Sequence, residues 1–170
     1  MIRMATEADL PQILTIFNEV VATSTAIYRN DPTTLEERAL WFSARHAAGF
    51  PVLVADGLDG VVGYSSFGDF RGAYPGYRHT VEHTVHVRAD SRGRGVGAEL
   101  VQALFPHAEA MEMHVMIGAI DAANEGSLRF HERLGFRRVG LLKEVGRKFG
   151  RWLDLVFVQK TFPLILPPAP

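Results

Sequence analysis

The stretch that decides the fold is residues 80–104, TVEHTVHVRADSRGRGVGAELVQAL. Its first part, up to Val87, alternates apolar and polar side chains, which predicts a strand. A polar turn and a glycine-rich run with two arginines follow. From Leu100 onward the apolar residues recur at helical intervals, which predicts a helix. A strand therefore leads through a glycine-rich, cationic turn into a helix.

This turn has the composition of an anion-binding site. The first amides of a helix lack intrahelical partners, and the helix dipole leaves partial positive charge there. Glycines allow a bulky anion to approach the backbone, and Arg92 and Arg94 add guanidinium groups suited to phosphate oxygens. The turn therefore predicts a phosphate or pyrophosphate site. The alternative is a solvated turn whose glycines only end the strand.

The spacing of the glycines narrows the choice of phosphate ligand. No GxxxxGK[ST] segment is present, which disfavours a nucleoside-triphosphatase loop. Gly93, Gly95 and Ala98 fit a loose dinucleotide pattern, GxGxx[GA]. Arg92, Gly95 and Gly97 fit a second pattern, RxxGxG after a strand. This second pattern resembles the acetyl-coenzyme A signature of the GNAT superfamily of N-acetyltransferases.

Length and composition exclude several other classes. The 170 residues, 47% of them hydrophobic, suit one domain over residues 1–162 with a proline-rich tail at 163–170. A net charge of -1 argues against nucleic acid as a partner. The absence of cysteine excludes a thiol nucleophile and disulfides. Without a signal peptide or a long apolar run, we expect a cytoplasmic protein that has no membrane partner.

The order of predicted elements indicates the fold class. Strands are expected at 2–5, 51–55, 61–67, 80–87, 114–120, 136–145 and 152–162, with a turn at 146–150 joining the last two. Helices are expected from about residues 7, 34, 97 and 127. This βααβββαβαββ order disfavours a doubly wound sheet. The resemblance implies the GNAT fold, an α/β (α+β) architecture with a mixed, strongly twisted sheet of about seven strands flanked by about four helices, which opens to admit coenzyme A.

Four phrases narrow the resemblance to one branch: PVLVA (51–55), GYSSFGDFR (63–71), TVEHTVHV (80–87) and VGRKFGRWLDLVF (145–157). They are similar to the phosphinothricin and methionine sulfoximine acetyltransferases, which acetylate the α-amine of small amino acids. His86 stands where these relatives usually have Tyr, and Phe70 where many have Trp. The loop after Arg71 is one residue longer. Phe70 and this loop bear on the choice of acceptor more than on acyl transfer.

Glu82 is the predicted general base. An α-ammonium group is mostly protonated at neutral pH, so a base within reach assists its attack. Glu82 lies in an otherwise apolar strand that leads to the glycine turn, and burial there would raise its pKa. The alternative is a strand glutamate that faces water. Because no cysteine is available, direct attack by the amine is simpler than a covalent enzyme intermediate.

The resemblance also implies how acetyl-CoA, the expected cosubstrate, is held. Backbone amides of the organising strand would contact its acetyl and pantetheine groups, the turn would hold its pyrophosphate, and the last helix would contribute a polar pair. His131 on that helix is either the acid that protonates the leaving thiolate or a packed histidine. The expected cosubstrate-binding residues are Val85, His86, Val87, Arg92, Gly93, Arg94, Gly95, Val96, Gly97, Ala98, Asn124 and Ser127.

The acceptor's carboxylate calls for a guanidinium. By resemblance Arg71 binds it, with Arg78 as the alternative, although either arginine is also typical of a plain surface. The resemblance places Gly72, Ala73, Glu82, His83 and Thr84 at the same substrate site, and Tyr28, Phe70 and Tyr74 could wall a small apolar pocket. The side chains of His83 and His86 are expected only to pack, without a metal site. Lys148 and Phe149 lie in a turn that relatives bring to a subunit interface, so we expect a homodimer.

The leading hypothesis is an acetyl-CoA-dependent N-acetyltransferase that acts on methionine sulfoximine, methionine sulfone or phosphinothricin. A second keeps the chemistry but has a protein N-terminus or a polyamine as acceptor; the arginines of the 68–79 loop disfavour a polyamine. A third is a non-catalytic acyl-CoA-binding module, against which Glu82 and Asn124 argue. A dinucleotide oxidoreductase is the weakest alternative.

Overall fold

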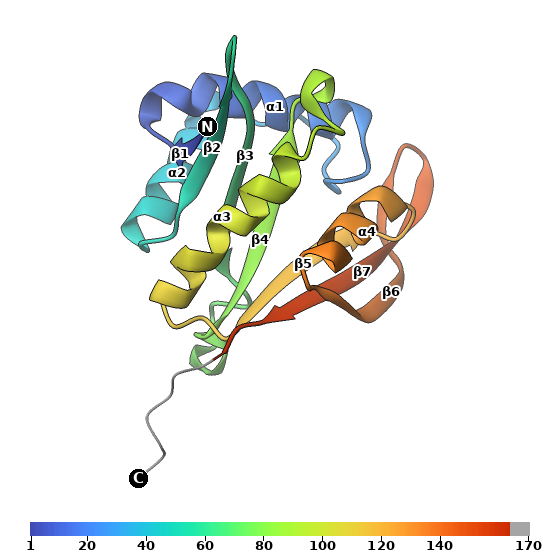
Figure 1. Cartoon of the computed structure of the whole chain (residues 1–170). Coiled ribbons are helices and arrows are strands. Elements are labelled where there is room, and N and C mark those ends of the chain that lie inside the picture. The colour runs from blue at the N-terminus through green and yellow to red at the C-terminus, as the bar shows by residue number, and fades with distance from the viewer. Residues whose placement is uncertain (164–170) are drawn as a thin grey trace.

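The computed structural model describes residues 1–163 and shows a twisted sheet with helices on both faces (Figure 1). Within these residues there are seven strands and four α-helices, as expected. The strands are β1 (Ile2–Met4), β2 (Val52–Gly57), β3 (Gly60–Asp69), β4 (Thr80–Val87), β5 (Val115–Asp121), β6 (Arg137–Lys148) and β7 (Arg151–Thr161). The helices are α1 (Leu10–Thr23), α2 (Leu35–Ala47), α3 (Val96–Ala110) and α4 (Glu125–Arg133). The expected tail lies outside the described residues except for Pro163, and the expected single domain over 1–162 stays a prediction.

The sheet is antiparallel except at its centre. Its strand order is β1-β2-β3-β4-β5-β7-β6, and the one parallel pair in the described chain is β4 with β5. That pairing covers only residues 80–82 against 115–117, although both strands continue beyond it. The ends of β4 and β5 therefore separate, and Figure 1 shows the two ribbons diverging. Backbone groups along the facing edges are left without a strand partner there.

Each face of the sheet has its own hydrophobic core. One core contains Phe67 and Val81 from the sheet with Leu100 and Leu104 from α3 and Leu128 from α4. On the other face, Ile13 and Ile16 of α1 pack against Val52, Val54 and Tyr64. Burying one such side chain contributes about 1.5–3 kcal/mol. The first core reaches both sides of the gap between β4 and β5, since it includes Val81 and Met116, whereas the second lies on the β4 side alone.

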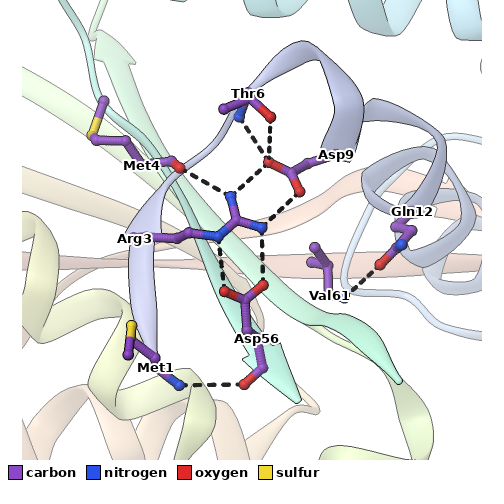
Figure 2. A network of polar contacts seen from close by, with 8 residues as sticks. All are labelled: Met1, Arg3, Met4, Thr6, Asp9, Gln12, Asp56 and Val61. Atoms are coloured by element: carbon purple, nitrogen blue, oxygen red, sulfur yellow. Dashed lines mark hydrogen bonds and ion pairs between the residues drawn. The ribbon is translucent and has the colours of Figure 1, made fainter. Parts of the chain in front are cut away.

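A polar network fixes the N-terminal edge (Figure 2). The Arg3 guanidinium donates to both carboxylate oxygens of Asp9, at 2.8 and 2.9 Å, and to both of Asp56, at 2.8 and 3.0 Å. The carboxylate of Asp9 also accepts from the Thr6 amide at 2.7 Å. Hydrogen bonds from Arg3 lower the pKa of Asp9 to about 2. The network ties β1 to the start of α1 and the end of β2, far from the central gap.

The turn expected at 146–150 is shorter in the structure. Strand β6 continues to Lys148, which pairs with Arg151, and the turn itself contains only Phe149 and Gly150. Both turn residues have positive φ, 49° and 75°, as a two-residue hairpin turn of type I′ requires. The extra strand residues place Gly146 and Lys148 on one face of β6, because side chains alternate along a strand.

Candidate active site

A cavity of about 410 Å³ lies where β4 and β5 separate. Side chains from both faces of the sheet reach it, so it passes between the two strands rather than lying on one surface. The residues that line it are Phe17, Ala26, Ile27, Tyr28, Glu82, His83, Thr84, Val85, His86, Gly118, Ala119, Ile120, Asp121, Asn124, Ser127, His131 and Leu155. Two substrates that approach from opposite faces could therefore meet inside the gap.

The glycine-rich turn lies at the end of β4 and opens α3. Gly93 and Gly95 both have positive φ, 74° and 87°, a conformation that side chains with a Cβ adopt only under strain. The first hydrogen bond of the α3 ladder runs from Glu99 N to Gly95 O. The amides of Val96, Gly97 and Ala98 are therefore not used by the helix, and they point outward at its positive end. This geometry suits a diphosphate.

The two arginines of the turn have different surroundings. The Arg92 guanidinium donates to the carbonyl of Val87 at 2.8 Å and to the carboxylate of Glu19 at 3.1 Å. It thereby fastens the turn to β4 and α1. Arg94 is exposed. We infer that Arg94 is free to contact an anion, whereas much of the hydrogen-bonding capacity of Arg92 is used by the protein.

The free edge of β4 presents its backbone to the gap. The Arg88 amide donates to Val62 of β3, so the amides of alternate residues along β4 point toward β3. The amides of His83, Val85 and Val87 therefore point to the opposite edge, where β5 has diverged. Val85 and Val87 thus fit the expected contacts with an acyl carrier through their amides, whereas the amide of His86 points to β3.

Glu82 lies at the last paired position of β4, opposite Ile117, and it lines the cavity. Burial raises the pKa of its carboxyl above the usual value, and the positive charge of Arg45 on α2 opposes that rise. The Arg45 guanidinium lies against Gly68, the cross-strand partner of Glu82, where any Cβ would overlap it. Glu82 is therefore a half-buried carboxylate with a cationic neighbour, which suits a group that accepts a proton.

His131 of α4 meets His83 of β4 inside the cavity. Their Nε2 atoms are 3.2 Å apart, and His131 Nδ1 is 2.8 Å from the carbonyl oxygen of Ser127. A carbonyl only accepts, so we assign the proton of neutral His131 to Nδ1. His83 Nε2 then donates to His131 Nε2. Burial lowers the pKa of His131 to about 4 and that of His83 to about 3, so both rings are neutral at pH 7. This arrangement favours a packed His131 over an acid.

Asn124 and Ser127 bring the start of α4 to the cavity. Asn124 is the N-cap residue, and its side-chain oxygen accepts from the amide of Ser127 at 3.1 Å. The cap uses the acceptor of the Asn124 side chain and leaves its NH₂ group, a donor, for another partner. An amide-rich ligand such as a pantetheine arm offers acceptors of the required kind.

Comparison with known proteins shows the family to which this chain belongs. A family model described as an acetyltransferase (GNAT) domain matches residues 2–157. The L-methionine sulfoximine/L-methionine sulfone acetyltransferase of Pseudomonas paraeruginosa is 50% identical over 159 residues, which cover 93% of this chain and 92% of the relative. The chain belongs to the GNAT acetyltransferase family. The expected family, fold and enzyme class are thus confirmed.

Two solved structures agree with this assignment. A GNAT superfamily phosphinothricin acetyltransferase from Sinorhizobium meliloti, in complex with acetyl-CoA, has a TM-score of 0.91 and 36% identity, covering 95% of this chain and 87% of that one. The ribosomal-protein-alanine N-acetyltransferase of Brucella melitensis has a TM-score of 0.93 and 46% identity, covering 95% and 99%. The first structure supports acetyl-CoA as the cosubstrate of GNAT enzymes. The two names give different acceptors, phosphinothricin in the first and the alanine of a ribosomal protein in the second.

The expected acceptor residues divide into two groups in this GNAT structure. Glu82, His83 and Thr84 line the cavity, whereas Arg71, Gly72 and Ala73 are exposed and do not. The Arg71 guanidinium lies over the rings of Tyr74 and Tyr77, 5.6 and 5.3 Å from their centres. Of the three expected wall aromatics, Tyr28 lines the cavity, and Phe70 and Tyr74 do not. The exposed position of Arg71 leaves its role in the acceptor site a prediction.

Several cavity residues were not predicted from the sequence. Phe17 comes from α1, Ala26 and Ile27 from the loop between α1 and α2, and Asp121 from the end of β5. Asp121 is buried and accepts a hydrogen bond from the hydroxyl of Thr25. A charged residue that ends a buried strand is a signal that could have identified Asp121. No comparable signal marks Ala26 or Ile27, because single apolar residues are also common in surface loops.

Two kinds of feature are absent from the described residues. No helix among them is both long and apolar enough to cross a bilayer. No group of three or more His, Cys, Asp or Glu side chains within residues 1–163 is arranged to hold a metal ion. The expectation of metal-free chemistry therefore stays a prediction.

Proposed function

We propose that this GNAT enzyme transfers the acetyl group of acetyl-CoA to the α-amine of a small amino acid or analogue such as methionine sulfoximine, methionine sulfone or phosphinothricin. The observation that carries the proposal is the position of Glu82. Its half-buried carboxylate lines the gap between β4 and β5, on the strand that leads directly to the glycine turn. The 50% identity to a methionine sulfoximine/sulfone acetyltransferase supports the acceptor class.

In the proposed reaction Glu82 removes a proton from the acceptor's ammonium group, and the free amine attacks the thioester carbonyl. A C–N bond forms, the C–S bond breaks, and the second proton of the attacking nitrogen is transferred through solvent to the departing thiolate, so the coenzyme leaves as its thiol. The amides of Val85 and Val87 face the gap and can donate to the oxygen on which negative charge develops. One such donor contributes about 3 kcal/mol of transition-state stabilisation. The amides of residues 96–98 hold the diphosphate, with Arg94 nearby.

A different acceptor is the second candidate. The similarity to a protein named as a ribosomal-protein-alanine N-acetyltransferase favours a protein N-terminus as an alternative. The cavity volume of about 410 Å³ suits a free amino acid that is largely enclosed. A peptide acceptor would need the cavity to continue into an open groove.

We also propose that the enzyme is a cytoplasmic homodimer without nucleic-acid, membrane or metal partners. The β6–β7 hairpin exposes a group of large apolar side chains, which mark an interaction surface when they gather on one element. They are Val139, Leu141, Leu142, Val145, Phe149 and Trp152. Sedimentation of the purified enzyme tests this part, and a monomer at micromolar concentration would refute it.

A thiol-release assay with acetyl-CoA tests the catalytic proposal. The panel contains L-methionine sulfone, L-methionine sulfoximine, phosphinothricin, spermidine and a short peptide with an N-terminal alanine. We expect release with the first three only. Release with the peptide alone would establish the second candidate. A rise in melting temperature with acetyl-CoA but no release with any amine would indicate a non-catalytic binding module.

A further inference from the structure

Lys148 is buried in an unusual way for a lysine. Only 2% of its surface is exposed, and its ammonium group donates to two backbone carbonyls, Ser24 O at 2.6 Å and Ile27 O at 2.8 Å. No salt bridge from Lys148 to a carboxylate is present within residues 1–163. A lysine is rarely buried without such a partner, because desolvating the charge is costly. The two carbonyls therefore replace water around this ammonium group.

The position of these carbonyls explains the need for a cation. Ser24 is the C-cap of α1, and the last turn of α1 contains no basic residue of its own. The carbonyl end of a helix carries partial negative charge, which a lysine or arginine normally offsets. Here the offsetting charge comes from β6, more than a hundred positions later in the sequence.

The same hairpin holds the rest of the loop. Gly146 lies on the same face of β6 as Lys148, and a Cβ at Gly146 would overlap the ring of Tyr28. The Tyr28 hydroxyl donates to Asp154 O of β7 at 2.8 Å. The loop at 24–28 is thus pressed against the hairpin by an ammonium group, a glycine contact and a hydroxyl.

This loop forms one wall of the cavity that Glu82 also lines. Ala26, Ile27 and Tyr28 are its contribution and follow the end of α1, whereas Asn124 and Ser127 of the same cavity come from the start of α4. If acetyl-CoA enters beside α4, the space next to residues 26–28 is left for the side chain of the acceptor amino acid. The position of the wall then limits the size of that side chain.

We propose that Lys148 is a positioning residue that, together with Gly146, fixes the loop at 24–28 as the wall of the acceptor site and so determines which amino acids are accepted. This inference rests on the proposed function, since it needs an amino-acid acceptor. It adds a role for a residue that does not itself line the cavity. Lys148 and Gly146 thereby act on specificity from positions that do not line the cavity.

The test compares Lys148→Met, which removes the charge and keeps the length of the side chain, with Lys160→Met. Lys160 is the matched control, because its ammonium group also donates to a backbone carbonyl, that of Leu134 at 3.0 Å, away from the cavity. The measured quantity is the ratio of kcat/KM for L-methionine sulfone to that for L-phenylalanine. Inactive protein lowers both values equally, so the ratio reports the wall and not stability.

We expect Lys148→Met to lower this ratio at least fivefold while the KM for acetyl-CoA changes less than twofold, and Lys160→Met to leave the ratio unchanged. Should Lys148→Met not fold, Gly146→Ala tests the same wall with the opposite sign, because its methyl group pushes Tyr28 into the cavity, leaves less room for L-phenylalanine and raises the ratio. An unchanged ratio in a folded variant at either position overturns the inference.

Amide hydrogen exchange gives a readout that does not depend on the acceptor. We expect faster exchange at residues 24–28 in Lys148→Met and unchanged exchange at residues 92–98. Equal protection of the 24–28 loop in variant and wild type would overturn the proposed positioning. If the 24–28 loop exchanges faster in Lys148→Met as expected, but the wild-type enzyme acetylates neither amino acid, the proposed function is refuted and the positioning by Lys148 is not.

Discussion

The two sides of the active site are built in different ways. In the proposed arrangement the coenzyme side comes mainly from one continuous stretch, residues 80–98, in which a strand, a glycine turn and a helix start follow one another, with Asn124 and Ser127 of α4 added. The acceptor side is assembled from α1, the 24–28 loop, β5 and, through Lys148, the β6–β7 hairpin. A local motif is suited to a ligand that all GNAT enzymes share. A wall assembled from distant segments can change without disturbing that motif.

Replacing Glu82, which lies between the two sides, should have the largest effect. We expect Glu82→Gln to lower kcat at neutral pH by about 100-fold or more, because general bases contribute about 10²–10⁴-fold. Affinity for acetyl-CoA, measured by calorimetry, should stay within twofold of wild type, since the amide cradle is untouched. Turnover that survives unaltered would show that Glu82 is not the base.

A substitution on the coenzyme side alone should change the binding of acetyl-CoA and leave the acceptor preference unchanged. Gly95 has a φ of 87°, and a Cβ in the left-handed region costs about 1–2 kcal/mol. We expect Gly95→Val to raise the KM for acetyl-CoA roughly tenfold, an effect of about 1.4 kcal/mol. The ratio of methionine sulfone to phenylalanine turnover should not change.

Gly140→Ala is the control for this substitution. Gly140 has an ordinary φ, and a Cβ there would meet nothing within 4 Å, so the KM for acetyl-CoA should remain that of the wild type. A change in acceptor preference in Gly95→Val would mean that the two sides are not independent.

A smaller effect is expected in the pH dependence of kcat/KM, which depends on the protonation of Glu82. The carboxylate form is the base, and burial raises its pKa, so activity is lost on acidification at a higher pH than for an exposed glutamate. Removing the opposing charge in Arg45→Met should move the acidic limb of kcat/KM to still higher pH. A limb that moves to lower pH in this variant would contradict the assigned effect of Arg45.

The smallest effect on catalysis is expected at the N-terminal edge, outside both halves (Figure 2). The folded-state pKa of Asp9 is about 2, below its ordinary value of 3.8. Its carboxylate therefore stabilises the fold fully above pH 3.8, and this contribution disappears as the pH falls toward 2. Because Arg3 is partly exposed, we expect Asp9→Asn to cost about 1–2 kcal/mol at pH 7 with unchanged kcat. Urea unfolding at pH 7 and pH 2.5 measures this, and an equal loss at both values would refute it.

The contrast between the halves also explains what the sequence could predict. Residues 80–98 carry their own pattern, so the strand, the turn and the helix start could be predicted from order and spacing, whereas the choice of Glu82 as the base depended on the resemblance to GNAT enzymes and stays a prediction. Ile27 and Lys148 carry no such pattern, because their role depends on a contact across more than a hundred positions. The expected turn at 146–150 was too long, since a strand ending in Gly and Lys resembles a polar loop. For His131 the sequence left two roles open, and only the ring contacts favour packing.

We propose above all that the amides of Val96, Gly97 and Ala98 hold the diphosphate of acetyl-CoA and that the gap between β4 and β5 directs its acyl end toward Glu82. A crystal structure with coenzyme A and L-methionine sulfone bound together tests it most directly. We predict the diphosphate on this turn and the acceptor's nitrogen within about 3 Å of the Glu82 carboxylate, the reach of a general base. A coenzyme bound elsewhere, or an acceptor whose amine points away from Glu82, would contradict the claim.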